Sequence, residues 1–375
     1  MKKILLGTAA VIGTAVTAQA GGLDRSGQDI GIIFESGNRL ELSYGNARPD
    51  LTGRDFLGNN VDNVAKSFGN TSAGLRYELS PKVSVAVVVD EPYGSDIVYE
   101  GNPASTMLGG TTATVDSFAV TALARYKFND SFSLHGGMRY QELSASVDLR
   151  GLAYGGLSGY RAEFDKDGAV GFVVGAAFER PEIGMRVALT YNSKITHDLA
   201  TRESMNGTLI SQGTTEIVTP ETLNLEAQTG IAADTLLFGS IRYARHEDTQ
   251  VSPTLFDASV DPTVSGSSIT DIENTTDIEI GIGRRFSDKF AAQVAIGYLA
   301  SSSDSLVSPL TPTNGSRYIS VGGSYTLNES VTLSGGIRYT KFGDAYAETG
   351  TPDVARAQFN DNSAVSAGFK VAYTF

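Results

Sequence analysis

Arginine followed directly by tyrosine recurs through the sequence, and this repeat has the clearest chemical meaning. The six pairs are Arg76-Tyr77, Arg125-Tyr126, Arg139-Tyr140, Arg242-Tyr243, Arg317-Tyr318 and Arg338-Tyr339. Adjacent residues of a β-strand point to opposite faces of the sheet. Each tyrosine would therefore continue an apolar face, and each arginine would point into a polar lumen. We expect most of these arginines to pair with acidic residues there; contact with a ligand is the alternative.

Residues that usually carry catalysis or bind metal ions are sparse. The three histidines, His135, His197 and His246, are far apart, and the sequence has no HExxH, GxSxG or phosphate-binding loop. The segment 247–276 has six acidic residues and no lysine or arginine. It lacks calcium-loop spacing, so we interpret it as a solvated or cation-bridged outer surface. We predict a protein that is not an enzyme, with no catalytic residue, bound metal or cofactor.

The elements that must position these residues are short segments in which apolar and polar or small side chains alternate. In the last of them, 363–375, an apolar side chain occupies every second position up to Phe375. This period of two is typical of a strand with one apolar face. Fourteen such segments lie between Arg39 and Phe375, and their connections alternate between short and long, six of the former and seven of the latter.

An even number of strands with connections sorted in this way is typical of outer-membrane barrels. We therefore predict an all-β fold: a 14-stranded antiparallel transmembrane β-barrel over 38–375, with short periplasmic turns, long extracellular loops and both termini on the periplasmic side. A β-sandwich or β-propeller would not sort its loops so regularly. The terminal Phe375 resembles the C-terminal signal that the barrel assembly machinery recognises in outer-membrane proteins.

The first 20 residues have the features of a secretory signal peptide. Lys2 and Lys3 precede an apolar run, and Ala18-Gln19-Ala20 is a small-x-small cleavage site. A membrane anchor is the less favoured alternative, because the run is short for a span. The chain has 29 basic and 42 acidic residues, which argues against nucleic-acid binding. It has no cysteine, so its stability does not depend on disulfides.

The segment 21–37 precedes the first predicted strand and contains apolar residues that water would not accommodate well. These are Ile30, Ile32, Ile33 and Phe34. A short plug inside the barrel is one interpretation, and an extension of the first strand is the other.

Two further features suggest a path for apolar molecules. Pro92, Tyr93 and Gly94 interrupt the third strand, which indicates either a kink that opens a gap beside it or a plain strand end. The predicted extracellular loop 149–167 is rich in apolar side chains: Leu152, Tyr154, Leu157, Tyr160 and Phe164. The next long loop adds Met205, Leu209, Ile210, Ile217 and Val218. Either these loops pack on each other, or they also form a landing site for a ligand.

Together these segments resemble the FadL/TodX-type outer-membrane transporters of long-chain fatty acids and other hydrophobic molecules. The resemblance covers most of the chain after the signal peptide. Its most specific details are Tyr191, Lys194 and the Pro220–Thr222 opening of the eighth strand. The motifs that carry it are VSVAVVVDEPYGSDIVYEG, SFSLHGGMRYQELSASVDL, GAVGFVVGAAFERPEIGMRVALTYNSKITHDL and PETLNLEAQTGIAADTLLFGSIRYARHED.

The resemblance implies a monomeric barrel of the bacterial outer membrane, closed by an N-terminal hatch. A hydrophobic ligand would land on a groove of the third and fourth outer loops and leave sideways, without pumping, at the kink of Pro92, Tyr93 and Gly94. Arg139 and Lys194 are candidates for holding a ligand carboxylate. The sequence departs from the family at the hatch, where the Asn-Pro-Ala stretch is absent and only about 17 residues precede the first strand.

These features favour passive transport of long-chain fatty acids or other hydrophobic molecules. The expected partners are that ligand, outer-membrane lipid and lipopolysaccharide. A general hydrophilic diffusion porin is the first alternative, and it would conduct ions steadily in a planar bilayer. A structural or adhesive surface barrel is the second, and its deletion would leave transport unchanged.

Overall fold

The computed structural model describes residues 23–260, 266–301, 305–350 and 352–375. The predicted signal peptide, 1–20, lies outside these ranges, as do the first two residues of the predicted plug. Within them, none of the helices has the length and apolar character needed to cross a membrane.

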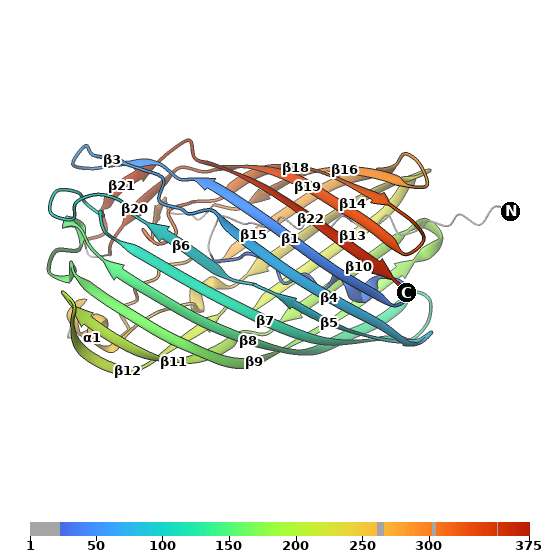
Figure 1. Cartoon of the computed structure of the whole chain (residues 1–375), viewed down its shortest axis with the longest axis horizontal. Helices are drawn as coiled ribbons and strands as arrows, with labels where there is room; N and C mark the ends of the chain where they lie inside the picture. The colour runs from blue at the N-terminus through green and yellow to red at the C-terminus, as the bar shows by residue number, and fades with distance from the viewer. Residues whose placement is uncertain (1–22, 261–265, 302–304, 351) are drawn as a thin grey trace.

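Fourteen long strands form a closed antiparallel barrel, three of them divided into two elements by a break (Figure 1). Alternating side chains let each strand present an apolar face to lipid while its backbone groups pair with both neighbours. The strands are β1 (Arg39–Asp50), β4 (Phe68–Ser80), β5 and β6 (Val83–Asp90, Gly94–Val98), β7 (Thr112–Lys127), β8 (Phe132–Leu149), β9 (Tyr160–Arg180), β10 and β11 (Met185–Asn192, Ile195–Met205), β12 and β13 (Thr208–Thr219, Thr222–Ala232), β14 (Thr235–Ala244), β15 (Thr275–Arg285), β16 (Phe290–Leu299), β18 (Ser316–Thr326), β19 (Val331–Phe342) and β22 (Ser363–Thr374). β22 closes the barrel on β1, with Arg39 opposite Thr374 and Asp50 opposite Ser363. The predicted 14-stranded antiparallel barrel is confirmed.

The two ends of the barrel differ in the way the sequence predicts. The short turns lie at one end together with the C-terminus, and the longer connections lie at the other (Figure 1). At that outer end, β2 (Gly53–Asp55), β3 (Asn60–Val61), β17 (Leu306–Val307), β20 (Ala345–Glu348) and β21 (Ala355–Phe359) form a second sheet. Short helices complete the chain: η1 (Gly31–Phe34), η2 (Leu152–Leu157), η3 (Pro181–Ile183), η4 (His246–Asp248) and α1 (Thr254–Val260).

Two of the predicted long loops contain long stretches of strand. β8 continues to Leu149, and β9 already begins at Tyr160. β11 and β12 are joined by Asn206 and Gly207 alone, both with positive φ (50° and 79°), the conformation that a two-residue hairpin turn requires. The expected fourth loop is therefore a long hairpin made of β11 and β12. It extends outward beyond the breaks that separate β10 from β11 and β12 from β13.

The Arg-Tyr repeats follow the predicted orientation at five of six positions. Their arginines are buried and their tyrosines exposed. The exception is Arg317-Tyr318, where the arginine is exposed and the tyrosine is buried. Tyr318 donates a hydrogen bond to Asp277 (3.0 Å), and the Arg338 guanidinium lies 4.0 Å from its ring. As expected, four of the buried arginines pair with carboxylates, in Arg76–Glu78, Arg125–Glu179, Arg242–Asp24 and Arg338–Glu279.

Candidate functional site

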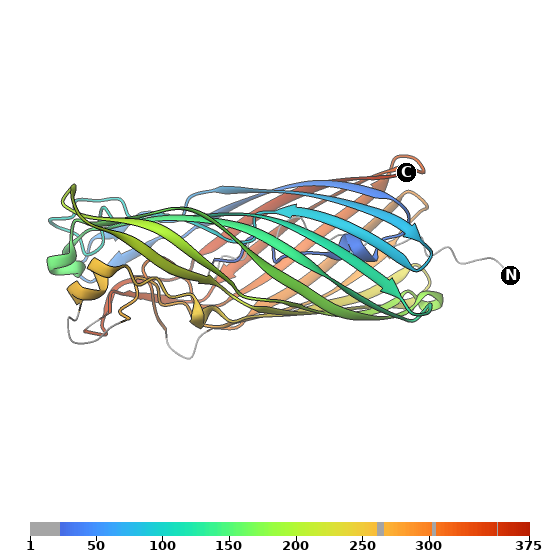
Figure 2. The same cartoon turned by 90° about the horizontal axis from the view of Figure 1, so that it is seen from below.

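The N-terminal segment, residues 23–37, runs inside the barrel before β1 begins (Figure 2). The side chains of Ile30, Ile32, Ile33 and Phe34 are buried and lie in or next to η1. They pack against small and apolar inward-facing residues of β5, β7, β9 and β10: Ala86, Val88, Leu123, Val173, Ala177 and Ala188. The structure thus has a folded-in segment here and not an extension of the first strand.

Phe34 is held between two cations. The guanidinium carbons of Arg125 and Arg186 lie 4.9 and 4.7 Å from its ring centroid, and the His135 ring meets it edge-on at 5.2 Å. A guanidinium over an aromatic face is attracted by the ring quadrupole, more strongly where water is excluded. These contacts with the Phe34 ring hold η1 within the barrel.

Asp24 ties the start of the described segment to the barrel wall. Its carboxylate pairs with Arg242 of β14 at 2.8 Å and lies 3.7 Å from Nε2 of His246. Gln28 adds to this contact by accepting a hydrogen bond from Thr222 (3.0 Å). Burial would raise the pKa of Asp24, but the charges of Arg242 and His246 and their hydrogen bonds hold that pKa well below its ordinary value.

The backbone of the same segment pairs with the break between β5 and β6. β4 pairs with β5 as far as Ala73 opposite Val89, whereas β6 pairs only with β7 within the barrel sheet. At the break, the Arg25 N–H donates to the Pro92 carbonyl and the Gly94 N–H donates to the Leu23 carbonyl, both at 2.8 Å. The N-terminal segment therefore pairs with the interrupted strand at the position where its ladder with β4 has ended.

Gly94 has a steric role at this break. A Cβ added to it would lie 2.1 Å from the guanidinium carbon of Arg25. Any larger residue would displace the arginine. Tyr93 is buried, and its backbone N–H and carbonyl are both hydrogen-bonded to the Ser117 hydroxyl (2.8 and 2.6 Å).

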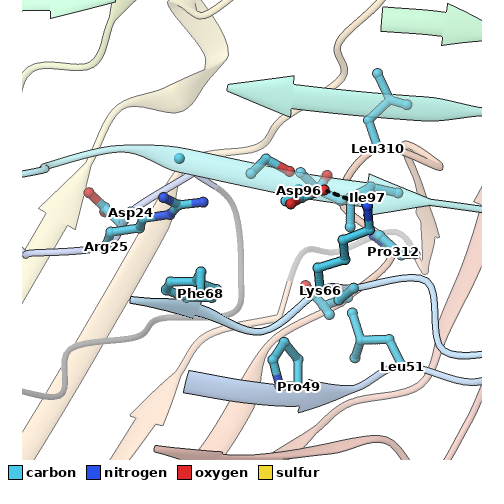
Figure 3. Close-up of a pocket in the computed structure, with 15 residues that line it drawn as sticks. Asp24, Arg25, Pro49, Leu51, Lys66, Phe68, Asp96, Ile97, Leu310 and Pro312 are labelled. Atoms are coloured by element: carbon cyan, nitrogen blue, oxygen red, sulfur yellow. Dashed lines mark ion pairs between the residues drawn. The ribbon is translucent and has the colours of Figure 1, made fainter. Parts of the chain in front are cut away.

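A small, partly open pocket lies beside the break (Figure 3). Arg25 reaches into it from the N-terminal segment, with its guanidinium 4.5 Å from the ring of Phe68. Lys66 and Asp96 form an ion pair across it (3.9 Å), and Leu310 contributes from the connection that precedes β18. Side chains and the N-terminal segment thus close the wall beside Pro92–Gly94. Beyond this point the chain before β4 bonds to β6 through its backbone, from the Lys66 N–H to the Asp96 carbonyl (3.1 Å) and from the Val98 N–H to the Val64 carbonyl (2.8 Å).

The two basic candidates for a ligand carboxylate lie on opposite sides of the wall. Arg139 is buried inside and donates to Thr121 Oγ1 (2.8 Å) and Asn192 Oδ1 (3.0 Å). Lys194 is exposed at the break between β10 and β11, with its Nζ 3.9 Å from Asp248. Arg139 and Lys194 are therefore not brought together, and each stays a separate candidate for a ligand carboxylate.

The five apolar residues predicted for an outer groove are not equally accessible. Tyr160 and Phe164 are buried in the apolar core of the outer end, because they lie on the inward face of β9 and alternate with charged residues. Tyr154 and Leu157 are partly buried against that core, and Leu152 of η2 is half exposed. Of these five, only the η2 residues therefore remain candidates for an open landing surface; from the next loop, Leu209 and Ile210 near the tip of the hairpin are exposed as well.

The family model of outer membrane transport proteins, OMPP1/FadL/TodX, matches residues 44–375. The chain belongs to this family. This confirms the family resemblance that the sequence indicated. It also confirms that the protein is a transport protein and not an enzyme, and that it belongs in the bacterial outer membrane. A search of curated protein sequences gave no significant match.

Solved structures of other members share the fold of this FadL/TodX-type transporter at low sequence identity. A Pseudomonas aeruginosa FadL homologue is 12% identical over 97% of each chain, with a TM-score of 0.73. The toluene transporter TodX of P. putida is 12% identical over 96% of this chain and 93% of its own, with a TM-score of 0.67. The Ralstonia pickettii toluene transporter TbuX is 11% identical over 91% and 90%, with a TM-score of 0.63.

Several residues that build the site of this transporter carry no recognisable sequence signal. The Arg-Tyr repeat predicts an acidic partner for Arg242, but nothing in the sequence indicates that this partner is Asp24, 218 positions away. Arg25 and Phe68 are also joined only by the fold. Among the described residues, no group of three or more His, Cys, Asp or Glu is positioned to hold a metal ion.

Proposed function

We propose that the protein passively transports long-chain fatty acids or other small hydrophobic molecules, and that they leave sideways through the gap between β4 and β6. The observation that carries this proposal is the break at Pro92–Gly94, where the wall is closed by side chains and by the N-terminal segment. Such contacts can be exchanged without unzipping a strand ladder. The similar structures include two described as toluene transporters, which supports an apolar cargo.

The N-terminal segment has the role of a plug in this proposal. It occupies the barrel interior and supplies Arg25 to the gap, so a shift of this one segment would clear both the interior and the exit. The polar groups around Arg139 would hold a ligand carboxylate by charge-assisted hydrogen bonds. The half-exposed face of η2, with Leu152, Tyr154 and Leu157, would be the landing surface.

The exit is tested by filling the pocket. Ser95 lines it, and Ser95→Trp should lower the uptake of radiolabelled oleic acid and toluene by whole cells several-fold, because the indole would occupy the exit. The amount of folded barrel in the outer membrane should not change.

The matched control is Ser105→Trp, the same substitution in the exposed connection that follows β6. It should leave uptake at the level of the unchanged protein. Normal uptake by a correctly assembled Ser95→Trp barrel would contradict an exit at this gap.

A further inference from the structure

A second interruption of the wall lies between β9 and the strand made by β10 and β11. β9 pairs with β10 up to Val173 opposite Asn192, and with β11 from Phe164 opposite Thr201. Between these points, residues 165–172 and 193–200, all of them described, have no ladder pairing with each other. We call these two stretches the seam.

Side chains hold the seam together in place of the ladder. The carboxylate of Asp167 accepts a hydrogen bond from the Asp198 N–H (3.3 Å) and lies 3.3 Å from Nδ1 of His197. At the lower end, the Ser193 hydroxyl accepts from the Phe172 N–H, and the Ser193 N–H donates to the Phe172 carbonyl, both at 2.9 Å. Arg202 of β11 also donates to both carboxylate oxygens of Asp165 (2.6 and 2.8 Å). Separating the seam therefore breaks one backbone hydrogen bond and a few side-chain contacts, and not a continuous ladder.

Small residues keep this part of the wall thin. β9 contributes Gly168, Ala169 and Gly171 to the seam. Ile195 packs directly on Gly171, where an added Cβ would lie 2.6 Å from its Cγ1. The buried Ile195 side chain thus occupies the space that the missing side chain of Gly171 leaves free.

The height of the seam places it at the outer membrane interface. Its lower end is flanked by the lipid-facing Tyr140, which lies opposite Val170 on the neighbouring strand, and by Tyr191, which lies opposite Val174. Tyrosines of this kind mark the boundary between lipid and water in membrane barrels. Above them the exposed residues are charged, as at Asp165 and Asp198. The seam therefore borders the outer leaflet at its lower end.

On its inner side the seam meets the polar interior. Arg139 lies opposite Gly171, and Gln141 lies opposite Ala169. Gln141 is fully buried, and its Nε2 has no hydrogen-bond partner within the described residues. A buried donor without a partner is unusual, and the polar end of an arriving molecule would satisfy it.

We propose that the seam is a second lateral portal, through which apolar molecules pass from the outer leaflet into the barrel. This proposal rests on the proposed transport function. The portal itself is separate from the gap between β4 and β6, because β7 and β8 lie between the two. The cargo it suits is an apolar molecule with one hydrogen-bond acceptor at its end, such as a fatty acid. An unsubstituted hydrocarbon would use it without the contact to Gln141.

A disulfide across the seam tests this proposal. A Cβ on Gly171 would lie 2.7 Å from Ser193 Oγ, so Gly171→Cys with Ser193→Cys brings two sulfurs within bonding reach in a chain that has no other cysteine. The oxidised pair should lower the uptake of radiolabelled oleic acid by whole cells several-fold, and a reductant should restore it. The control pair, Ala176→Cys with Leu189→Cys, lies in the continuous β9–β10 ladder and should not respond to oxidation.

A loosening variant makes the test independent of disulfide formation. Asp167→Ala removes the side-chain contact in the middle of the seam and should raise uptake, whereas Asp198→Ala, which removes an exposed carboxylate but keeps the backbone N–H that donates to Asp167, should not. Equal uptake in the oxidised and reduced seam pair, together with unchanged uptake in Asp167→Ala, would overturn the portal. If Ser95→Trp still inhibits uptake in that case, the proposed transport function stands; if it does not, both proposals fail.

Discussion

Asp24 is the single residue that connects the N-terminal segment to two parts of the wall. The backbone on either side of it pairs with the strand break, while its side chain pairs with Arg242. A carboxyl group whose pKa is lowered in the folded state contributes stability above its unfolded pKa and loses it only as the pH falls through the lowered value. The pKa of Asp24 lies well below its ordinary range, so this contact should stay intact from about pH 8 down to about pH 5.

Removing the charge of Asp24 should loosen the segment. Asp24→Asn leaves Arg242 buried without its ionic partner, and breaking a buried pair in this way costs about 3–5 kcal/mol. We expect the variant to open more often than the unchanged protein, with a higher mean ion conductance in planar bilayers.

Asp29→Asn is the matched control, since it removes the same charge from an exposed position of the same segment. The two variants should differ clearly in conductance. Equal, low conductance in both would mean that the Asp24–Arg242 pair does not keep the segment in place.

At the scale of elements, α1 is held to the barrel extension by one buried carboxylate. Glu203 at the end of β11 accepts hydrogen bonds from the Tyr160 hydroxyl (2.8 Å) and from the backbone N–H groups of Leu255 (2.9 Å) and Phe256 (3.0 Å). The Phe256 ring packs on Tyr160 at 5.5 Å. A helix of seven residues is not stable alone in water, so this docking keeps α1 folded.

Glu203→Ala should therefore unfold α1 locally. It leaves three donors without an acceptor, and each buried unsatisfied group costs about 1–3 kcal/mol. Hydrogen exchange of the amides of Leu255 and Phe256 should become faster, while the barrel strands keep their protection. Glu216→Ala, at an exposed position of β12, should leave α1 protected; equal exchange in the two variants would refute the role of Glu203.

At the scale of the whole molecule, the barrel depends on the pairing of its first and last strands. β22 pairs with β1 along twelve residue positions, and the Phe375 N–H donates to the Asn38 carbonyl at 3.0 Å. The Phe375 ring stacks on Tyr373 at 5.7 Å. Closure leaves no unpaired edge in the membrane, so assembly must bring together two ends of the chain.

We predict that Phe375→Ala lowers the amount of assembled barrel, because a terminal aromatic residue would be needed by the assembly machinery. Heat-modifiable mobility in gel electrophoresis of outer-membrane fractions measures this amount. Phe369→Ala is the control, since Phe369 lies on the same strand and is equally exposed, at 55%. A similar yield for both variants would argue against a special role for the terminal position.

The sequence by itself determined the strands, their number and the orientation of the barrel. Alternation with a period of two and the length of each connection are local properties, so they can be read along the chain without knowing its partners. The apolar residues around Phe34 and the interruption at Pro92 were visible for the same reason. The continuation of the chain beyond Lys194 into a long hairpin was missed, because its outward face is largely polar and its inward face mixes apolar residues such as Leu199 and Ile217 with polar ones such as Thr201 and Glu203. No apolar face therefore alternates along it.

Only the tertiary structure decided which residues meet. The pairing of Asp24 with Arg242, the placement of Arg25 beside Phe68 and the burial of Tyr160 follow from barrel closure and strand register, which no local pattern encodes. The seam is a case of the same kind, since β9 is one continuous strand from Tyr160 to Arg180 and its missing pairs become visible only beside β10 and β11. Contacts between distant segments decide where this wall is held by side chains, and those places are where we expect it to open.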